Sequence, residues 1–384
     1  MTKAIILSLF ILFTGFIVTA QNKDEIDEKN QSSLKKDQVD KNDDNYKYKP
    51  SSIDVTENIF MLKGMGGNIA VQNGIDGALM IDTQFENASE FIQTIIQRKT
   101  EKQVEFIVNT HLHGDHVGGN KNFSRKGATV IAHKNVRDNI TNNLNKNSRE
   151  DILKSLTAEI EEAEKKGNVD GKVKEMKKNI EKRVEQIAED TQADIDYEAL
   201  PAISFENDLL FHYNDEDIQL IHLPNAHTNS DIIVNFRKSN VLHTGDAFVN
   251  GMYPYLDTKN GGSYNGYIEG LKKIERLCNK DTKIIPGHGE LASFTDVKEM
   301  ATMLELYYSR IKTAFLQNKT EDQVAAMRDF TKFYDNKAYG EGFITTEKFL
   351  RTLYGEVEKN EGVYKRRNEA KQKKYEESQK ENKN

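Results

Sequence analysis

One segment narrows what this chain can fold into more than any other: Asn109–Asn120, which reads NTHLHGDHVGGN. It places three histidines and an aspartate within six positions, although the 384-residue chain has only 9 histidines. The apolar run Val104–Asn109 that leads into it is typical of a buried β-strand. Imidazole and carboxylate groups are ligands for zinc, iron, manganese and cobalt. The segment therefore predicts a metal site at the end of a strand.

The spacing within this segment predicts two metal positions. Residues two apart in an extended chain point to the same side, so His111 and His113 can share one ion. The next residue, Gly114, permits a sharp turn. Such a turn could direct Asp115 and His116 toward a second ion close to the first.

The rest of the chain supplies further ligand types in comparable places. Each follows a short apolar run that reads as a strand, and each lies in the loop after that run. Ligands from several strand ends can be preorganised by one rigid sheet edge. These residues are His227 after Ile218–Leu223, Asp246 after Val241–Thr244, and His288 after Lys283–Pro286.

The order of elements predicts a mixed α/β domain over residues 51–300. Short β-rich runs, punctuated by Gly and Asn, alternate with a helical segment at Phe91–Gln97. Besides the runs that precede the ligands, the predicted strands are Asn58–Lys63, Asn68–Gln72, Ala78–Asp82, Ala128–Ala132 and Asp231–Phe236. Within 136–199, apolar residues recur at helical spacing on both sides of a turn at 166–171, which predicts an inserted helical hairpin. A solvated surface excursion and a lid over a nearby site are both consistent with this insertion.

The N-terminus is predicted to be a signal peptide at residues 1–20. Lys3 precedes Ala4–Val18, an almost unbroken apolar run that is short for a membrane span, and small residues follow it. Cleavage would leave a mature chain that begins at Gln21, exported to a periplasm or secreted, with no stable membrane anchor. The alternative is an uncleaved anchor. Residues 21–50 are polar and charged, which predicts a disordered linker.

Beyond the α/β domain the sequence predicts a helical extension at 301–356 and a charged tail at 357–384. The formal net charge of −7 gives no reason to expect a nucleic acid as partner, although a local basic patch would be compatible with it. The partner expected is a small-molecule substrate. The single cysteine, Cys278, can form no intramolecular disulfide and is expected to be an inert, partly buried thiol.

The full set of histidines and aspartates, in this order, resembles the metallo-β-lactamase-fold hydrolases over residues 53–299. Their pattern is His-x-His-x-Asp-His, then a single His, a single Asp and a final His. The resemblance implies an α/β fold of the αββα kind, in which two sheets pack between helices with metals at one edge. In this chain the sandwich would carry the inserted hairpin and the helical extension. Complete retention of the ligands favours an enzyme over a binding protein with a relic site.

The resemblance also implies a role for each ligand. Two zinc ions per chain are expected, with iron or manganese as alternatives. Two ions that share a water can lower its pKa toward neutrality, and the resulting hydroxide attacks a carbonyl or phosphoryl centre. Asp115 would be catalytic as well, because it could orient this nucleophile. The first ion would be held by His111, His113 and His227, and the second by Asp115, His116 and His288, with Asp246 bridging both.

The bond cleaved stays open among an ester, a lactone, an amide or β-lactam, a thioester and a phosphodiester. The best-known β-lactamases of the family have a cysteine in place of Asp246 and a lysine three residues later, where this chain has Val249. Another β-lactamase class normally lacks the bridging acid. A β-lactamase proper is one alternative. The other is an oxidoreductase similar to the persulfide dioxygenases, with one iron held by His111, His227 and Asp246.

Five more residues are candidates for the site. Asp82 ends an apolar run and matches an aspartate that in this family supports the ligands, with a turn former as its alternative. Asp231 is a second candidate for such support. The segment Asn250–Tyr267, rich in Tyr, Gly and Asn, could form the substrate pocket or a turn-rich connection. Its candidate pocket residues are Tyr253, Tyr255 and Tyr264.

The remaining histidines are not expected to bind metal. His133, His222 and His243 lie in or beside apolar strands, where a packed or hydrogen-bonded imidazole is the simpler interpretation. His212 lies in a polar, loop-like stretch and is expected to be exposed.

Overall fold

The structure of the chain is a computed structural model that describes residues 47–142 and 196–381. The chain divides into two compact units, residues 1–47 and residues 48–384. All described residues except Lys47 belong to the second unit, which contains both sheets and all of the predicted metal ligands.

Several predicted segments lie wholly or mostly outside the described residues. These are the signal peptide at 1–20, the linker at 21–50 and the insertion at 136–199. Of the insertion, the structure describes a helix over 134–142 and a short turn of 3-10 helix, η4, at Tyr197–Ala199. No helix within the described ranges is both long and apolar enough to span a membrane.

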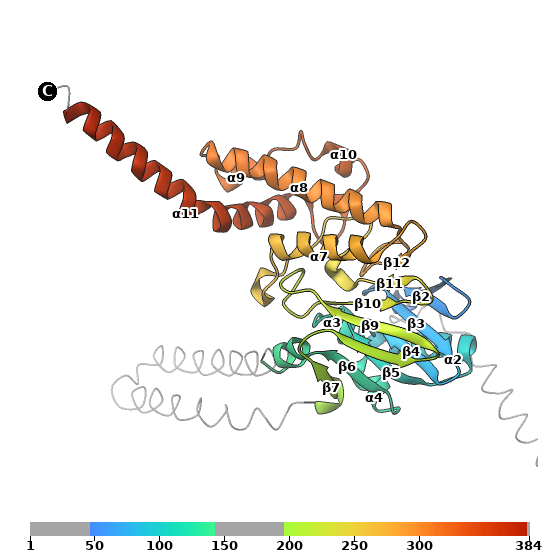
Figure 1. The fold of residues 1–384 in the computed structure, drawn as a ribbon. Helices are drawn as coiled ribbons and strands as arrows, with labels where there is room; N and C mark the ends of the chain where they lie inside the picture. Colours follow the sequence, from blue (N-terminus) through green and yellow to red (C-terminus); the bar gives the residue numbers. More distant parts are fainter. Residues whose placement is uncertain (1–46, 143–195, 382–384) are drawn as a thin grey trace, which may run out of the picture. The chain divides into compact units, whose positions relative to one another are not determined.

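Seven strands form the first sheet, in the order β1-β2-β3-β4-β5-β6-β7 (Figure 1). Strands β1 to β4 pair antiparallel, and β4 to β7 pair parallel. The parallel pairs require crossovers, and helix α2, Ser89–Thr100, joins β4 to β5. The strands are β1 Ser51–Asp54, β2 Ile59–Lys63, β3 Ile69–Gly74, β4 Gly77–Ile81, β5 Val104–Asn109, β6 Thr129–His133 and β7 Ile203–Phe205.

Five strands form the second sheet, in the order β12-β11-β10-β9-β8. Strands β8 to β11 pair antiparallel, and β12 pairs parallel with β11. The parallel pair again needs a crossover, which contains helix α7, Tyr264–Leu277. The strands are β8 Leu209–Tyr213, β9 Glu216–His222, β10 Ile232–Phe236, β11 Val241–His243 and β12 Lys283–Ile285.

Alternation along β4 shows why both faces of the first sheet are buried. Leu79 and Ile81 point into the core between the sheets, where Val234 of β10 also lies. Met80 points to the other face, into a separate core that includes Ile92 of α2. Because neighbouring residues of a strand face opposite ways, one apolar run supplies both cores.

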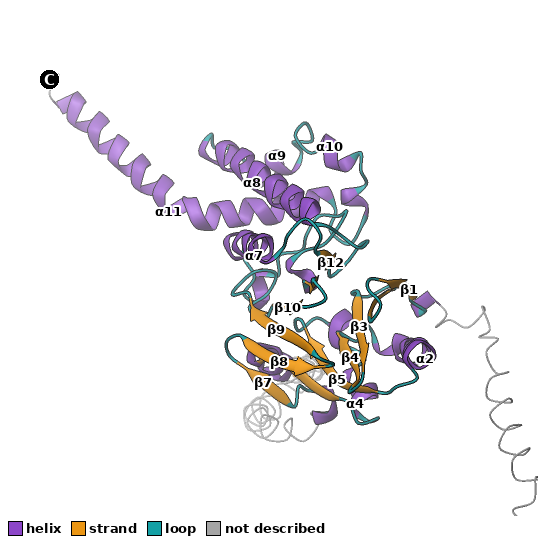
Figure 2. Ribbon diagram, turned by 45° about the vertical axis from the view of Figure 1, so that its right-hand side comes forward, coloured by secondary structure: helices purple, strands orange, loops and turns teal. Residues whose placement is uncertain are grey.

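Helices cover the outer faces of both sheets, so the architecture is αββα as predicted (Figure 2). Helix α2 and the short helix α4, Asn120–Ser124, cover the first sheet. The second sheet is covered by α7 and by α8, Phe294–Leu316, which share one apolar core with residues of β9 to β12. Short helices α9, Glu321–Ala325, and α10, Lys332–Asp335, follow α8.

The last helix, α11, extends beyond the predicted end. It runs from Thr346 to Glu381, so the helix does not stop near Glu356. Its first turns pack against α8 and α9, and Val357 is still fully buried. The residues after Val357 are rich in Glu and Lys, whose intrinsic propensity favours a helix.

Most predicted strands are present to within two residues at either end, but three strands were not predicted. Strand β8 lies at the edge of its sheet and is half exposed, so its pattern is less apolar than that of a central strand. The prediction of a loop around His212 is therefore wrong, since this residue lies in β8. Its side chain is exposed as predicted, and Nδ1 lies 2.9 Å from Oδ1 of Asp217.

Candidate metal centre

Strand β5 and the loop after it position the first predicted ligands at an edge of the first sheet. The end of β5 is fully buried, which fixes the chain just before His111. Helix α3, Gly114–Val117, starts directly after His113, and the amides of His116 and Val117 donate to the His113 carbonyl. The loop thus passes from strand to helix within a few residues and presents four ligand-type side chains.

The chain turns into α3 at Gly114, as predicted, but this turn does not require a glycine. This glycine does not have a left-handed backbone, and an added Cβ would meet no atom within 4 Å. The close approaches occur at two other glycines. A Cβ at Gly67 would lie 2.1 Å from Cε1 of His116, and one at Gly287 would lie 2.0 Å from Oδ1 of Asp246. Both loops can touch the ligands only because these positions lack a side chain.

Three histidines form the first ligand group. Nδ1 of His113 lies 3.1 Å from Nε2 of His111 and 2.8 Å from Nε2 of His227. The three ring nitrogens therefore converge on one point, with His227 contributed by the loop after β9. Together with Asp246 they form a set of four donors whose atoms lie within 4.8 Å of one another.

The second group consists of Asp115, His116 and His288, as predicted. Nε2 of His288 lies 3.3 Å from Oδ2 of Asp115 and 3.4 Å from Nε2 of His116. His288 follows β12, whereas the other two residues lie in α3. The structure thus brings together ligands from the ends of strands in both sheets.

Asp246 lies between the two groups. It belongs to a short 3-10 helix, η5, Gly245–Ala247, directly after β11. Its Oδ2 lies 3.6 Å from Nε2 of His227, in the first group. Its Oδ1 lies 3.2 Å from Nε2 of His116 and 3.4 Å from Nε2 of His288, in the second group. One carboxylate therefore presents one oxygen to each group.

Each histidine of the first group is oriented by a partner outside the cluster. Nδ1 of His111 lies 3.0 Å from the hydroxyl of Thr110, and Nδ1 of His227 donates to the carbonyl of Tyr255 at 2.7 Å. Nε2 of His113 donates to Oδ2 of Asp257 at 2.8 Å. Such contacts fix the ring and its tautomer. Asp257 was not among the predicted residues, because nothing in the sequence near it resembles a ligand motif.

Asp82 supports the centre as predicted. Its Oδ2 accepts from Nδ1 of His116 at 2.7 Å and from the hydroxyl of Thr110 at 2.7 Å. Its Oδ1 accepts from the amide of Thr110, also at 2.7 Å. The side chain is fully buried, and its backbone is left-handed with φ of 65°, an uncommon conformation for an aspartate. The hydrogen bonds compensate for this strain and connect the two ligand groups.

The titration of the histidines fits a bound cation. Burial lowers the pKa of both His111 and His227, the latter to about 4, so both rings are neutral at pH 7 and free to bind metal. Burial also acts to lower the pKa of His116, but the carboxylates of Asp246 and Asp82 outweigh it and raise this pKa well above its usual value. The carboxylates around His116 therefore favour a positive charge at the second group, which either a proton on this ring or a metal ion can supply.

One atom of the centre has no good hydrogen bond. Oδ1 of Asp246 is buried and has no hydrogen-bond partner among the described residues, despite the two nearby ring nitrogens. A buried carboxylate oxygen without a partner is costly unless a cation satisfies it. Imidazole and carboxylate donors around such an oxygen fit a pair of divalent transition-metal ions.

Asp231 does not contact a ligand. It is fully buried, and its two carboxylate oxygens accept from the amide and the hydroxyl of Thr228, at 2.8 and 2.7 Å. It therefore closes the turn directly after His227. Burial raises its pKa to about 7.

Only one of the three predicted pocket tyrosines lies beside the ligands. The Tyr255 ring is stacked 6.0 Å from the His113 ring and lies edge-on 5.7 Å from the His227 ring. Tyr253 instead stacks on Phe349 of α11 at 4.5 Å and is almost fully buried. Tyr264 starts α7 and stacks at 3.9 Å on Tyr308 of α8. The predictions for these two are wrong, because helices far along the chain cover them.

The other histidines of the apolar strands are hydrogen-bonded, as predicted. His243 Nε2 donates to the carbonyl of Asn68 at 3.0 Å. The rings of His133 and His222 stack at 3.8 Å, and each contacts a backbone carbonyl. Cys278 is partly buried, as predicted, and burial raises the pKa of its thiol to about 12.

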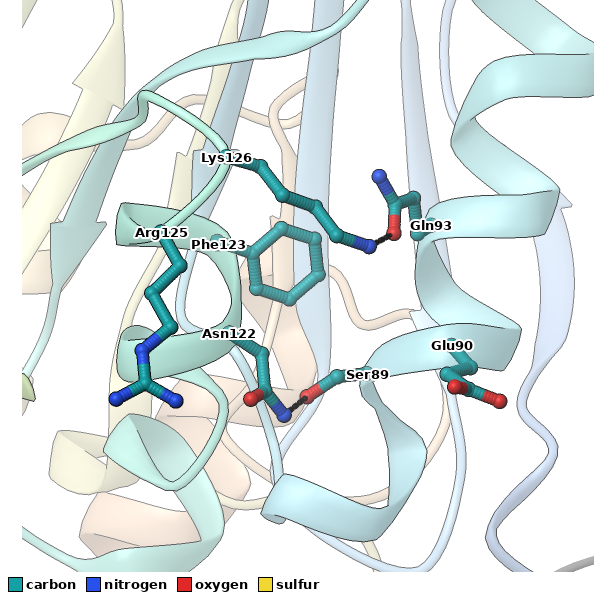
Figure 3. Close-up of a pocket in the computed structure, with 7 residues that line it drawn as sticks. All are labelled: Ser89, Glu90, Gln93, Asn122, Phe123, Arg125 and Lys126. Atoms are coloured by element: carbon teal, nitrogen blue, oxygen red, sulfur yellow. Dashed lines mark hydrogen bonds between the residues drawn. The ribbon is translucent and has the colours of Figure 1, made fainter.

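A separate pocket of about 240 Å³ lies on the outer face of the first sheet, between α2 and α4 (Figure 3). Phe123 lines it, and its rim is held by a hydrogen bond of 3.1 Å from Asn122 to Ser89 and by one from Lys126 to Gln93. It contains none of the clustered histidines and aspartates. The metal centre, and not this pocket, is therefore the candidate functional site.

The chain is similar to several known proteins. A segment of 70 residues is 31% identical to the alkyl/aryl-sulfatase BDS1 of Saccharomyces cerevisiae, and it covers 17% of this chain and 11% of that protein. The structure of a metallo-beta-lactamase from Pontibacter korlensis aligns over 67% of this chain and 99% of its own, with 15% identity and a TM-score of 0.47. The structure of the metallo-beta-lactamase IND-7 aligns over 67% of this chain and 98% of its own, with 16% identity and a TM-score of 0.47.

The family assignment rests on a longer match. Residues 63–288, more than half of the chain, match the sequence profile of the Metallo-beta-lactamase superfamily. The matched range contains the seven residues of both ligand groups and most of both sheets. The αββα architecture and the clustered His and Asp donors are those expected of this family. The chain therefore belongs to the metallo-beta-lactamase superfamily.

Proposed function

We propose that this protein is a hydrolase with a dinuclear zinc centre. The observation that supports it best is the position of Asp246, whose two oxygens face the two ligand groups. A single carboxylate placed in this way can hold two ions close together. When bound, two such ions would polarise the substrate and make a water acidic enough to attack at neutral pH.

Asp115 is proposed to orient the attacking water. Its carboxylate is about a quarter exposed, so a water or a substrate can reach it. Burial acts to raise its pKa, but the charge of His116 and the hydrogen bond from His288 outweigh it and lower the pKa. The group is therefore ionised at pH 7 and can accept a hydrogen bond or a proton.

The bond cleaved is proposed to be an ester, a lactone, an amide or β-lactam, a thioester or a phosphodiester. A sulfate ester joins this set because of the short match to a protein named alkyl/aryl-sulfatase. Against a β-lactamase of the best-known kind, no lysine or arginine lies between Asp246 and Lys259. We therefore favour an ester-type substrate over a β-lactam.

The test is the metal content of the purified protein together with hydrolysis assays on one substrate of each class. We expect two zinc ions per chain and turnover of at least one substrate. His116→Ala should abolish that turnover, whereas His212→Ala, a change at an exposed histidine of β8, should not. One iron per chain with no hydrolysis would overturn the proposal and favour the dioxygenase-like oxidoreductase, which needs only His111, His227 and Asp246.

Export is a separate proposal that rests on the N-terminal sequence. The apolar run Ala4–Val18, followed by small residues, is typical of a cleaved signal. We propose that the mature protein begins at Gln21 and acts in a periplasm or outside the cell. N-terminal sequencing of the protein from a fractionated expression host tests this, and a chain that still begins at Met1 in the cytosol would contradict it.

A further inference from the structure

The side of the metal centre next to the first ligand group is formed by an aromatic side chain. Tyr255 lies against the rings of His113 and His227, and its own carbonyl orients His227. Its side chain is only partly buried. A substrate with its reactive group at the ligands would therefore extend over this ring.

The segment just before α11 continues this side. The ring of Phe343 lies edge-on to Tyr255 at 5.8 Å, yet it is 77% exposed. A large apolar ring left in water beside a metal centre is available to contact a ligand. Phe343 lies outside the residues that match the family profile, so it is a feature of this chain's C-terminal region.

A lysine side chain lies beside both aromatic rings. Nζ of Lys348, in the first turn of α11, lies 4.0 Å from the centre of the Phe343 ring and 5.4 Å from that of Tyr255. Among the described residues no carboxylate forms an ion pair with this ammonium group. Because the Tyr255 ring lies 5.4 Å from Nζ of Lys348 and 6.0 Å from the His113 ring, the ammonium group lies close to the first ligand group.

We propose that Tyr255, Phe343 and Lys348 form a substrate-binding surface for an anionic amphiphile. The two rings would hold its apolar or aromatic body, and Lys348 would bind a carboxylate or sulfonate at its far end. The inference rests on the proposed hydrolase function, because the substrate must place its scissile bond at the ligands.

The kinetic test uses two para-nitrophenyl esters of equal chain length, one ending in a carboxylate and one in a methyl group. Lys348→Gln should raise the KM of the anionic ester relative to that of the neutral ester by about three- to tenfold, as expected for one charge-assisted contact near solvent. Lys348→Arg should restore the ratio. Phe343→Ala should raise KM for both esters. An unchanged KM ratio in Lys348→Gln would overturn the proposal.

The chain offers a matched control. Nζ of Lys337, just after α10, lies 4.4 Å from the centre of the exposed Phe333 ring of α10. This is a similar pair that contacts no ligand of the metal centre. Unlike Lys348, Lys337 forms an ion pair with Glu299, at 2.8 Å. Lys337→Gln and Phe333→Ala should leave the KM of both esters unchanged. A change as large as that of the Lys348 and Phe343 variants would mean that the effect is not specific to the surface.

A binding assay separates this inference from the proposed function. Anilinonaphthalene sulfonate is an aromatic sulfonate that fluoresces when it leaves water, and the chain has no tryptophan to interfere. Metal-free and metal-loaded protein should both bind the dye, and Lys348→Gln, but not Lys337→Gln, should weaken binding severalfold. If neither ester is cleaved but this difference holds, only the hydrolase proposal fails. If the two variants bind the dye equally, the surface proposal fails.

Discussion

The two ligand groups of the metal centre are held in different ways. In the first group, each of His111, His113 and His227 has its outer ring nitrogen in contact with a group outside the cluster. In the second group only His116 has such a partner, Asp82. Asp115 and His288 are 26% and 25% exposed, and no described residue forms a hydrogen bond or ion pair with Nδ1 of His288.

This difference shows how one cluster can combine rigidity with access. Rings oriented by outer hydrogen bonds are preorganised and more basic, and therefore bind an ion more tightly. Ligands that are partly exposed leave room for water and substrate, as an active position requires. The first group is thus expected to bind its ion more tightly than the second. The second group is expected to contact the attacking water and the substrate.

Loss of the shared ligand should have the largest effect, because it acts on both groups. Within residues 47–142 and 196–381, Asp246 is the side chain with one oxygen toward each group, and Asp246→Ala removes it. We expect fewer than two zinc ions per chain. The loss of kcat/KM should be well beyond the about 10- to 100-fold that is typical when a residue hydrogen-bonded to a ligand is changed. Metal analysis and steady-state kinetics on one sample measure both. A variant that kept two ions and its activity would show that the groups are independent.

Asp257 and Asp82 orient ligand histidines from outside the cluster. The same change at each of them should affect the two ligand groups differently. Asp257→Asn weakens the support of His113, and Asp82→Asn weakens that of His116. Each should lower metal affinity by about 10- to 100-fold, with Asp257→Asn acting on the first ion and Asp82→Asn mainly on the second. Competition with a chromophoric chelator measures the dissociation constants of the two ions. If both variants weaken binding of the same ion, the two carboxylates do not support separate groups.

Metal removal should occur in two steps. Because the second group is less well supported, a chelator should remove its ion at a concentration about tenfold lower than the first, within the range attributed to outer partners. Native mass spectrometry would then show a population with one ion per chain. His288→Ala should bind one ion from the start, and His113→Ala should retain neither ion firmly. Simultaneous loss of both ions would contradict the difference between the groups.

The smallest effect is expected at the turn after His227. Asp231 has a pKa of about 7 in the folded protein against 3.8 for an ordinary aspartate, so between these values the folded chain holds a proton that the unfolded chain has lost. Stability from this group therefore falls as pH rises from about 4 to about 7 and is flat above.

Denaturant unfolding of the metal-free protein across this pH range tests the sign. In Asp231→Asn the group does not titrate, so the free energy of unfolding of the variant relative to wild type should rise between these pH values. A difference that stays constant with pH would show that Asp231 remains ionised. Metal affinity of the first group should change only slightly, since Asp231 contacts no ligand.

Local pattern was sufficient to predict most of the fold. Apolar runs bounded by Gly and Asn predicted nearly all of the central strands, because such strands are buried on both faces and their sequence is dominated by that burial. Edge strand β8 and the continuation of α11 were not predicted correctly. Their residues are half exposed or charged, and burial leaves a weaker pattern in such segments.

The sequence by itself determined the ligand set, since each ligand lies in the segment that follows a short strand and these strand ends meet at one edge. Tertiary structure alone decided what surrounds it. Tyr253 and Tyr255 are two residues apart, yet Tyr253 donates to Asp335, 82 residues away, while Tyr255 faces the ligands. Asp257, Phe343 and Lys348 likewise reach the site through contacts between distant segments, and no local pattern encodes such contacts.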